Sequence, residues 1–486
     1  MASKGGRSPD ILVTLSPSRA RQKTGIDKLT ELIAELQQGH TPNARKLQDT
    51  LTYAAGVLKN VTSMPDVRED ELIISEDEDS AATRWVNGTF RRRSTGDAMT
   101  DERLKELHEI GKTLPLTNEW MEQLLQKADI KEFLQVSHRW TFDSIELRGL
   151  TTRPLQCIGF KVFQEYDLMS TLAISANVLH QFLTEIERKY IDPNNPYHNE
   201  THATEVTQAM HSLIANTNLQ NWLSKLEMLA CFLAAIIHDV DHPGTTNEFN
   251  VISRTELAIV YNDKSVLENH HLSTAFNVMN KDSCNILSRL NTLEFRVVRT
   301  MITELVLATD MELHSSQLKQ METILENDKL ENCHKIQVMS CCLHWCDISH
   351  PMRSKKVNEK FTYDLLQEFQ KQGQKEKAMG LPISPMCEED NKSNVSKSQT
   401  TFIDNVVKPL LDVVTRIVRK ELVKDDSSSS TVRLGDRDKK ATAKATSGNY
   451  EEWIKIVTES CEANLKNWAS KEDGRETKDE THERSN

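Results

Sequence analysis

Three short stretches of the sequence supply histidine or aspartate, two side chains that commonly bind divalent metal ions. In 197–202, two histidines stand four residues apart, so a helix would place both on one face. His238-Asp239 follows the apolar run 228–237, and Asp347 follows the apolar run 337–346. Each feature alone has an ordinary structural explanation, such as a histidine that caps polar groups or a helix-end carboxylate that faces water. Their chemical meaning therefore depends on the combination.

The combined set is His202, His238, Asp239 and Asp347, a mixture of imidazoles and carboxylates that suits zinc, manganese, iron or magnesium. A carboxylate at the end of a buried helix is unfavourable unless it is paired or bound to a cation. Asp239 has two oxygens and could bridge two ions, and two ions can activate a nucleophile and neutralise phosphate charge. The order H…HD…D is that of the HD hydrolases. The sequence therefore predicts a two-metal hydrolase that cuts a phosphodiester bond.

His198 lies one helical turn from His202, close to the predicted metals without being needed as a ligand. An imidazolium is a natural acid near neutral pH, and hydrolysis of a phosphodiester requires a proton for the leaving alkoxide. We therefore expect His198 to be the catalytic general acid. A nearby carboxylate should hold its proton on the correct nitrogen, and Glu268 is the candidate.

Helices must position these residues. The 486 residues include 16 Gly and 13 Pro, roughly half the usual share of these helix-breaking residues. Apolar runs of helical length recur from residue 101 to residue 423, and two-residue alternation is scarce. The predicted fold class is therefore all-α, a compact multi-helix domain.

Composition divides the chain into four parts. Residues 1–100 contain two periodic segments and an acidic stretch, and we expect a regulatory region that is partly helical and partly disordered. Residues 101–423 form the predicted catalytic domain. Residues 424–448 are a polar, low-complexity insertion, and residues 449–486 comprise a last amphipathic helix, from 450 to 468, and a charged tail.

Charge and cysteine content limit the classes of partner and compartment. The formal net charge of −12 argues against a sequence-independent nucleic-acid binder. Nine cysteines without a CxxC pair suit a reducing compartment. The longest apolar run, 228–237, is too short for a membrane span of about 20 residues, and the N-terminus lacks the apolar core of a secretory signal. We expect a cytoplasmic protein with no membrane span and no nucleic-acid partner, and the sequence leaves a homodimer open.

Seven stretches of the sequence closely resemble the catalytic domain of class I cyclic nucleotide phosphodiesterases, in the family's order and with compatible spacing. They are 197–211, 238–247, 261–271, 308–311, 346–351, 380–387 and 398–404. The resemblance implies hydrolysis of 3′,5′-cyclic nucleotides, cAMP and/or cGMP, to 5′-nucleotides. It also implies zinc at His202, His238, Asp239 and Asp347, and a second ion, magnesium or manganese, on Asp239 and waters.

The same resemblance implies roles for residues around the ions and the substrate. The residues that would orient water around the ions are His242, Glu268, His271, Thr309 and Asp310. The residues that would bind the substrate are Tyr197, His350, Leu365, Gln399 and Phe402. Gln399 matches the family's purine-binding glutamine, while Phe402 and Leu365 match the two sides of the clamp around the base. An amide carries donors and acceptors, so Gln399 could read either purine if its orientation is free.

The calcium/calmodulin-dependent subfamily, whose members accept both cyclic nucleotides, shows a similar His at the position of His350. Segments 27–39, 47–61 and 84–93 resemble that subfamily's regulatory region. Calmodulin binds basic amphipathic helices with bulky apolar anchors, so we expect activation by calcium–calmodulin. Three features depart from the pattern: Phe361 replaces a usual Trp, the loop 387–399 is one residue longer than in many relatives, and the insertion 424–448 has no counterpart. Ser94 follows three arginines and resembles a target of a basophilic kinase.

Two other functions remain open at this point. An HD-type nucleotidase or triphosphohydrolase acting on another phosphate ester would share the metals but leave Gln399 and Phe402 unexplained. A non-enzymatic cyclic-nucleotide sensor would be marked by a missing ligand, and none of the four is missing. The sequence does not distinguish a preference for cAMP from one for cGMP.

Overall fold

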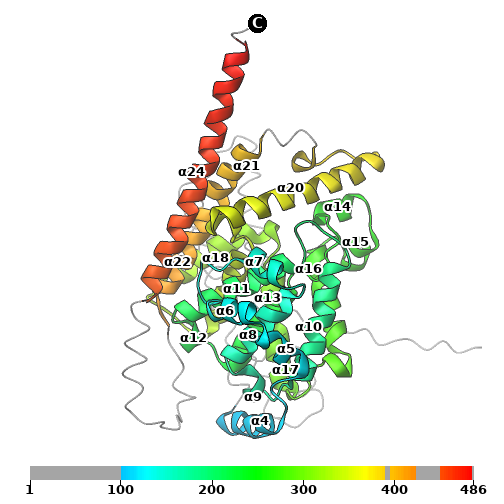
Figure 1. The fold of residues 1–486 in the computed structure, drawn as a ribbon, viewed down its shortest axis with the longest axis vertical. Coiled ribbons are helices and arrows are strands. Elements are labelled where there is room, and N and C mark those ends of the chain that lie inside the picture. The colour runs from blue at the N-terminus through cyan, green and yellow to red at the C-terminus, as the bar shows by residue number, and fades with distance from the viewer. Residues whose placement is uncertain (1–99, 389–393, 423–448, 484–486) are drawn as a thin grey trace, which may run out of the picture. The chain divides into compact units, whose positions relative to one another are not determined.

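The computed structural model describes residues 100–388, 394–422 and 449–483, which all belong to the unit Thr95–Asn486 (Figure 1). These residues are almost entirely helical, and their only strands are β1 (Lys329–Leu330) and β2 (Glu421–Leu422), which pair in parallel. The predicted all-α fold class is confirmed. No described helix combines the length and apolar character needed to cross a membrane. The predicted calmodulin-binding segments, Ser94 and the insertion 424–448 lie outside the described residues.

The helices occur in one continuous series along the chain. The α-helices are α4 (Asp101–Thr113), α5 (Glu119–Gln126), α6 (Ala128–Gln135), α7 (Ser144–Leu150), α8 (Pro154–Glu165), α9 (Leu168–Thr171), α10 (Ala176–Ile191), α11 (Glu200–Asn216), α12 (Leu219–Trp222), α13 (Lys225–Ile237), α14 (Asn247–Ile252), α15 (Glu256–Tyr261), α16 (Val266–Met279), α17 (Thr292–Leu307), α18 (His314–Glu326), α19 (Lys335–Asp347), α20 (Lys355–Ala378), α21 (Val395–Phe402), α22 (Lys408–Arg419) and α24 (Asn449–Glu483). The short 3₁₀ turns are η2 (Asp282–Cys284), η3 (Met311–Leu313), η4 (Asn332–His334), η5 (His350–Met352) and η6 (Pro385–Cys387). A π-helical segment, Ile403–Val407, joins α21 to α22.

Capping side chains fix where the two helices next to the candidate site begin. Asn199 caps α11, because its side-chain oxygen accepts hydrogen bonds from the amides of Thr201 (2.9 Å) and His202 (3.4 Å). Ser224 and Glu227 form a capping box at the start of α13, in which each side chain bonds the other residue's backbone amide. The position of each cap determines which residues the following turns present to the interior.

Helix α13 lies at the centre of the hydrophobic core (Figure 1). Every side chain from residue 228 to residue 237 is at most 4% exposed, so this helix has no polar face and must be covered on all sides. Helices α8, α11, α17 and α19 pack around it. The residue that follows α13, His238, is therefore delivered into the protein interior rather than into water.

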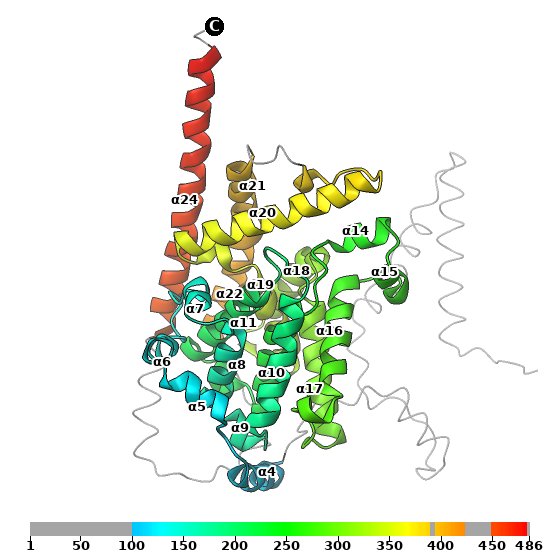
Figure 2. The same ribbon diagram turned by 45° about the vertical axis from the view of Figure 1, so that its right-hand side comes forward.

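Helix α20 lies across one end of the other helices (Figure 2). Asn358, Phe361, Thr362 and Glu368 on this helix are all buried. Spacings of three and four residues place these side chains along one side of a helix. Glu368 bonds the backbone of Tyr197 and His198, so this side of α20 meets the residues just before α11.

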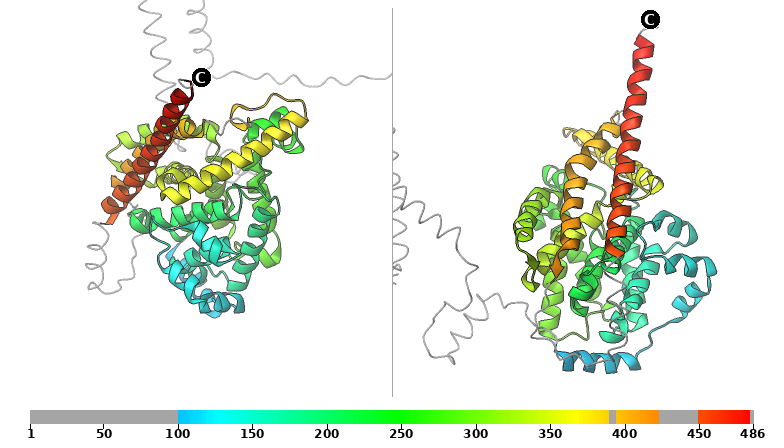
Figure 3. Two further views of the ribbon diagram at one scale, coloured as in Figure 1. Left: turned by 45° about the horizontal axis from the view of Figure 1, so that its top comes forward. Right: turned by 90° about the vertical axis from the view of Figure 1, so that its left-hand side faces the viewer.

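The C-terminal helix α24 packs onto this body with its first half, and its far end extends beyond the other helices (Figure 3). Its Trp453 is buried and lies 5.6 Å from Trp140 and 5.7 Å from Trp345, measured between ring centroids. Its Trp468 is fully buried and donates a hydrogen bond to Asn358 on α20 (2.8 Å). The amphipathic helix expected between residues 450 and 468 is present as part of α24.

His211, on α11, is a fully buried histidine outside the candidate site, and it predicts how stability depends on pH. Its Nδ1 bonds the hydroxyl of Tyr166 (2.9 Å), and its Nε2 has no hydrogen-bond partner among the described residues. Burial lowers the pKa of His211 from 6.5 to about 4. The unfolded chain therefore binds a proton here below about pH 6.5, while the folded protein binds it only near pH 4. His211 alone should therefore lower the free energy of unfolding by roughly 3 kcal/mol as the pH falls through this window.

We predict that His211→Asn flattens this dependence. An Asn side chain can still donate to Tyr166 but cannot take up a proton, so the loss of stability between pH 6.5 and pH 4 should shrink. Urea unfolding at a series of pH values measures the effect as a slope, which a change in baseline stability does not alter. His108→Asn, on α4, is the control and should keep the wild-type slope. An unchanged slope in His211→Asn would contradict the assignment.

Candidate metal centre

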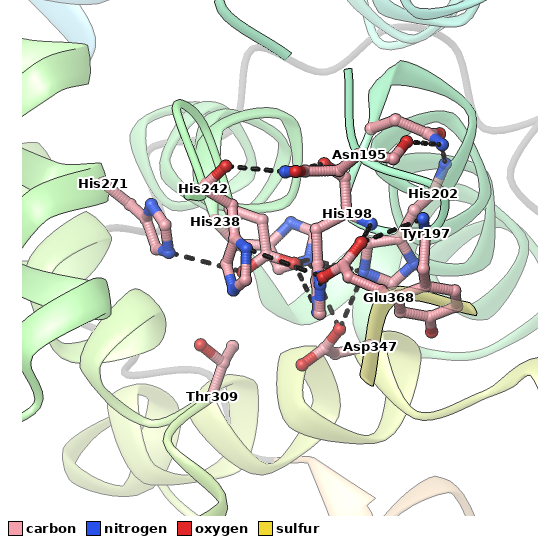
Figure 4. A network of polar contacts seen from close by, with 12 residues as sticks. Asn195, Tyr197, His198, His202, His238, His242, His271, Thr309, Asp347 and Glu368 are labelled. Atoms are coloured by element: carbon pink, nitrogen blue, oxygen red, sulfur yellow. Dashed lines mark hydrogen bonds and ion pairs between the residues drawn. The ribbon is translucent and has the colours of Figure 1, made fainter. Parts of the chain in front are cut away.

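The four predicted metal ligands converge from three helices, and Figure 4 labels His202, His238 and Asp347 among them. His202 lies in the first turn of α11, His238 and Asp239 follow the last turn of α13, and Asp347 is the last residue of α19. One nitrogen or carboxylate oxygen from each residue lies within 4.8 Å of those of the other three. Residues separated by up to 145 positions in sequence therefore form one compact donor set.

The spacing of these atoms fits a single tetrahedral ion. The Nε2 atoms of His202 and His238 are 3.1 Å apart. Oδ1 of Asp347 lies 3.1 Å and 3.3 Å from these two nitrogens, and Oδ2 of Asp239 lies 3.2 Å from each of them. Ligand atoms about 2.0 Å from a tetrahedral zinc are held roughly 3.3 Å apart. The donor set therefore matches the size that a structural or catalytic zinc requires.

The electrostatics of the cluster favour a cation. Burial raises the pKa of Asp347, but hydrogen bonds from His202 and His238 outweigh burial and hold it well below its usual range. The pKa of Asp239 is likewise held low, against burial, chiefly by His238. Burial lowers the pKa of His238, but Asp239 raises it well above its usual value. Two largely buried carboxylates thus favour positive charge at this point, and a divalent ion provides it.

His238 is oriented for ligation through Nε2. Its Nδ1 lies 3.0 Å from the carbonyl oxygen of Ala235, which can only accept a hydrogen bond, so Nδ1 carries a proton. The other nitrogen, Nε2, therefore points into the cluster and offers its lone pair once an ion replaces any proton there. A backbone acceptor behind a metal-binding imidazole is the usual way in which a protein fixes its tautomer and orientation.

A second cluster, His198, His242 and Glu368, adjoins the first. Nδ1 of His198 hydrogen-bonds Oε1 of Glu368, and its Nε2 lies 3.9 Å from Oδ2 of Asp239. The prediction that Glu268 orients His198 is therefore wrong, because Glu368 occupies that place. Oε2 of Glu368 also accepts hydrogen bonds from the backbone amides of Tyr197 (3.0 Å) and His198 (3.1 Å).

His198 and Glu368 form an ion pair. Burial lowers the pKa of His198, but the charge of Glu368 and its hydrogen bond outweigh burial and raise that pKa to about 9. Burial raises the pKa of Glu368, but His198 lowers it to about 2. His242 stacks on His198, with ring centroids 3.9 Å apart, and burial followed by the charge of His198 holds the pKa of His242 well below its usual value. A protonated His198 thus lies between a carboxylate and a neutral imidazole.

The residues predicted to orient water lie around the cluster with different partners. Nε2 of His271 lies 3.6 Å from Oδ1 of Asp239, and its Nδ1 donates to the carbonyl of Val240 (2.8 Å). Glu268 is buried and accepts a hydrogen bond from Asn247 (3.0 Å), and burial raises its pKa to about 7. Among the described residues, His271 therefore contacts a predicted metal ligand, whereas Glu268 bonds Asn247 instead.

Thr309 and Asp310 complete this group at the end of α17. The hydroxyl of Thr309 donates to the carbonyl of Val306 (2.8 Å), and Figure 4 shows its side chain beside the cluster without a bond to the residues drawn. Asp310 accepts a hydrogen bond from Ser265 (2.8 Å). Both residues are buried. Their part in orienting water stays a prediction.

Two of the predicted substrate residues, Tyr197 and Leu365, belong to one apolar group next to His202. The ring of Tyr197 lies 4.6 Å from that of His202 and 5.8 Å from that of Phe361. Leu365 packs against the same group. Phe361, the residue that departs from the family pattern, is buried here and so forms part of the wall under Tyr197.

The other three predicted substrate residues lie on η5 and α21. Nδ1 of His350 accepts a hydrogen bond from Asn358 (3.2 Å). Oε1 of Gln399 accepts one from the hydroxyl of Thr362 (3.3 Å). Phe402 is partly buried and packs against the main core. Since Asn358 and Thr362 both belong to α20, this helix links the predicted base site to Glu368, whereas binding of substrate stays a prediction.

Sequence reasoning missed two residues that hold the site together. Glu368 follows Leu365, a predicted pocket residue, by three positions, and this helical spacing is the signal that could have identified it. The side-chain amide of Asn195 donates to the carbonyls of His198 (3.2 Å) and His242 (2.6 Å) and so ties two loops together. Gly244, at φ +69°, leaves room for it, because an added Cβ would lie 2.5 Å from Oδ1 of Asn195.

A helical domain with an ordered His…His-Asp…Asp cluster defines the HD class of metal-site proteins. Comparison with protein families gives a match over residues 197–425 to the family described as 3′5′-cyclic nucleotide phosphodiesterase. The chain belongs to this family, in agreement with the resemblance that its motifs carry.

Named relatives give the same assignment. The chain is 34% identical over 452 residues to the dual specificity calcium/calmodulin-dependent 3′,5′-cyclic nucleotide phosphodiesterase 1B of Cricetulus griseus, covering 87% of this chain and 84% of that protein. It is 34% identical over 433 residues to the probable 3′,5′-cyclic phosphodiesterase pde-1 of Caenorhabditis elegans, covering 83% of this chain and 63% of the nematode protein. It is 37% identical over 380 residues to a dual specificity calcium/calmodulin-dependent relative of Drosophila melanogaster, covering 75% of this chain but only 45% of the fly protein.

A solved structure supports the fold. The phosphodiesterase domain of the RhoPDE fusion protein from the choanoflagellate Salpingoeca rosetta superposes with a TM-score of 0.60 at 27% sequence identity. The match covers 73% of this chain and 99% of that domain. The described helices therefore have the arrangement of a phosphodiesterase domain.

We predict that zinc stabilises the protein and that Asp347→Ala removes this effect. A ligand that binds only the folded state at 100 times its Kd adds about 2.7 kcal/mol, which for a domain of this size corresponds to a rise in Tm of a few degrees. Thermal unfolding after treatment with a chelator, with and without added zinc, measures the rise. Asp412→Ala removes an exposed carboxylate on α22 and should keep the full zinc response. An equal rise in Asp347→Ala and wild type would count against the metal centre.

Proposed function

We propose that this chain hydrolyses 3′,5′-cyclic nucleotides, cAMP and cGMP, to 5′-nucleotides in a metal-dependent reaction. The observation that carries the proposal is the position of the His198–Glu368 pair directly beside the four-residue donor set, 3.9 Å from Asp239. A phosphodiester hydrolase needs a cationic centre, which activates the nucleophile and neutralises phosphate charge, and a proton donor for the leaving oxygen on the same phosphorus. Membership of the cyclic nucleotide phosphodiesterase family supports this choice of substrate.

In the proposed centre, His202, His238, Asp239 and Asp347 would hold zinc, and Asp239 would also contribute to a site for a second ion, magnesium or manganese. Two imidazole nitrogens favour zinc at the first position, while the carboxylates of Glu268 and Asp310 give the neighbouring region the oxygen-rich character that magnesium prefers. Bound ions of this kind neutralise phosphate charge and make water a better nucleophile. His242, His271 and Thr309, with those carboxylates, would hold the surrounding waters in place.

His198 supplies the proton for the leaving oxygen. Glu368 accepts a hydrogen bond from Nδ1, so the second proton of the imidazolium sits on Nε2, the nitrogen nearer Asp239. The raised pKa keeps this proton in place near neutral pH. As the bond from phosphorus to O3′ breaks, Nε2 donates its proton to O3′, and the ribose hydroxyl leaves uncharged. The imidazole that remains is stabilised by Glu368 until it is protonated again.

The base is recognised by residues that α20 supports. Gln399 would bond the purine edge, Phe402 and Leu365 would lie against its two faces, and Tyr197 and His350 would line the same pocket. The hydroxyl of Thr362 donates to Gln399, and a hydroxyl can rotate to accept instead. The Gln399 amide is therefore not confined to one orientation, which supports acceptance of both adenine and guanine.

The proposed catalytic domain spans residues 101–423, and calcium–calmodulin would act on segments within residues 1–100. Relatives that carry calcium/calmodulin dependence in their names support this part of the proposal. All nine cysteines are free, and eight of them are buried, which supports a place in the reducing cytoplasm.

We predict that His198→Asn lowers kcat by roughly 10²–10⁴ for both nucleotides, because an amide cannot supply the proton. The zinc content of the purified variant, measured by metal analysis, should stay at the wild-type level, since His198 is outside the donor set. His180→Asn, on α10, replaces a partly buried histidine that stacks on Trp120 and should keep the wild-type kcat. Wild-type turnover by His198→Asn would remove His198 from its proposed role.

We predict that calcium–calmodulin raises the rate at which the 486-residue chain hydrolyses both cAMP and cGMP. The assay compares initial rates with calmodulin plus calcium and with calmodulin plus a calcium chelator, which serves as the matched control. Deoxynucleoside triphosphates are offered in parallel and should release no phosphate. Turnover of the triphosphates alone would instead identify an HD-type triphosphohydrolase. Equal rates with and without calcium would refute the proposed regulation while leaving the catalytic proposal intact.

A further inference from the structure

The end of α13 presents a problem of hydrogen bonding that the sequence does not reveal. The last carbonyls of a helix have no partner within the helix, and here they are buried. The carbonyl of Ala235 accepts from Nδ1 of His238, and that of Ile237 accepts from the amide of Val240. The carbonyl of Ile236 lies between these two and requires a partner from elsewhere in the protein.

Tyr190, in the last turn of α10, provides that partner. Its side chain is fully buried, and its hydroxyl oxygen lies 3.1 Å from the carbonyl oxygen of Ile236. The same hydroxyl oxygen lies 3.1 Å from the amide nitrogen of Asp239. One phenol group thus connects the last turn of α13 to the backbone of the predicted bridging ligand.

The direction of both hydrogen bonds is fixed by the chemistry of the groups. A backbone amide only donates and a backbone carbonyl only accepts. The amide of Asp239 therefore donates to the phenol oxygen, and the phenol proton is given to the carbonyl of Ile236. Tyr190 uses its donor and one acceptor lone pair, and among the described residues it is the only partner of the Asp239 amide.

This bond has a consequence for the path of the chain. In a continued α-helix the amide of Asp239 would bond the carbonyl of Ala235, four residues earlier. That carbonyl is engaged by the side chain of His238, and the Asp239 amide bonds Tyr190 instead. The backbone leaves the helix here, and the Asp239 carboxylate is placed 3.2 Å from Nε2 of both His202 and His238.

Other contacts hold the same turn, but none of those between described residues involves the Asp239 amide. Nδ1 of His271 donates to the carbonyl of Val240, and Nε2 of His270 donates to Oδ2 of Asp241 (3.0 Å). Both histidines belong to α16, and these two hydrogen bonds hold residues after Asp239, while Nε2 of His271 lies 3.6 Å from the Asp239 carboxylate. The carbonyl of Asp239 accepts from the amide of His242 within the same turn (3.2 Å), whereas its amide bonds Tyr190, from α10.

We propose that Tyr190 is a positioning residue for the metal centre: its hydroxyl sets the backbone at Asp239 and thereby the affinity of the site for its ion. The proposal rests on the metal-binding role of the four-residue cluster. Groups that orient metal ligands without touching the metal typically contribute about 10–100-fold to affinity. Removal of the hydroxyl leaves both the Asp239 amide and the Ile236 carbonyl without a partner, so the turn must rearrange.

Tyr190→Phe tests this proposal, because it deletes the hydroxyl and keeps the ring. The apoprotein is titrated with zinc in competition with a chromophoric chelator, and Tyr190→Phe should bind zinc at least tenfold more weakly than wild type. Cobalt is used as a second probe, since the absorption spectrum of bound cobalt reports ligand geometry and should change. Neither readout depends on enzymatic activity.

Tyr166→Phe is the matched control. Tyr166 is also buried, and its hydroxyl bonds His211 rather than a residue of the metal cluster. This control should keep wild-type zinc affinity and the wild-type cobalt spectrum even if its stability falls. Equal zinc affinities and cobalt spectra in Tyr190→Phe and wild type would overturn the role of Tyr190, as would an equal loss in Tyr166→Phe.

A measurement on the wild-type protein covers the case in which Tyr190→Phe does not fold. Hydrogen exchange of the peptide that contains residues 238–240 should show a protected Asp239 amide in the apoprotein, although no backbone carbonyl accepts from it. Exchange as fast as in an exposed loop would overturn the proposal. If the wild-type protein binds no zinc at all, the metal centre itself is wrong. If wild type and Tyr190→Phe bind zinc equally well, only the proposed role of Tyr190 is wrong.

Discussion

Two carboxylates lie within about 3 Å of two imidazoles at the ends of buried helices, and this arrangement constrains the rest of the molecule. Asp239 and Asp347 are largely removed from water, where an unpaired charge is strongly unfavourable. A cation shared by all four side chains resolves the conflict. The rigid apolar core around α13 is what keeps the four donors together, because a helix with no polar face cannot turn its end toward solvent.

Helix polarity adds to the same effect. His238 and Asp239 follow the C-terminal end of α13, and Asp347 is the last residue of α19. A helix C-terminus carries about half a negative charge, so both helices direct negative potential toward the cluster. Helix ends and carboxylates thus favour a cation together. The site depends on where α13 and α19 end. The hydrogen bonds at the end of α13 therefore affect the position of the predicted ligands.

The sequence predicts three of the four candidate metal ligands, His238, Asp239 and Asp347, because each sits at a boundary that hydrophobic patterning reveals, whereas His202 is found from its spacing to His198. The apolar runs that end at residues 237 and 346 are α13 and α19, and the residues after them must enter the interior. Glu368 was harder to predict, because it lies in the middle of a long helix with many charged residues, and only its spacing from Leu365 distinguishes it. Tyr190 could not be predicted from the sequence, since its role depends on the Ile236 carbonyl and the Asp239 amide, and no sequence pattern identifies such backbone partners. The fold class follows from periodicity, whereas the packing of α20 over the start of α11 depends on tertiary contacts.

Helix α20 explains how chemistry and recognition are coupled. Along one side of it, Asn358 contacts His350, Thr362 contacts Gln399, and Glu368 contacts His198. The hydrogen-bond partners of His198 and of the predicted base-site residues His350 and Gln399 therefore all belong to one helix. A shift of α20 would move the hydrogen-bond partner of His198 together with that of Gln399. Positioning of the base and protonation of the leaving group should consequently be gained or lost together, which favours hydrolysis of a cyclic nucleotide over that of a smaller phosphate ester that fills only the metal end.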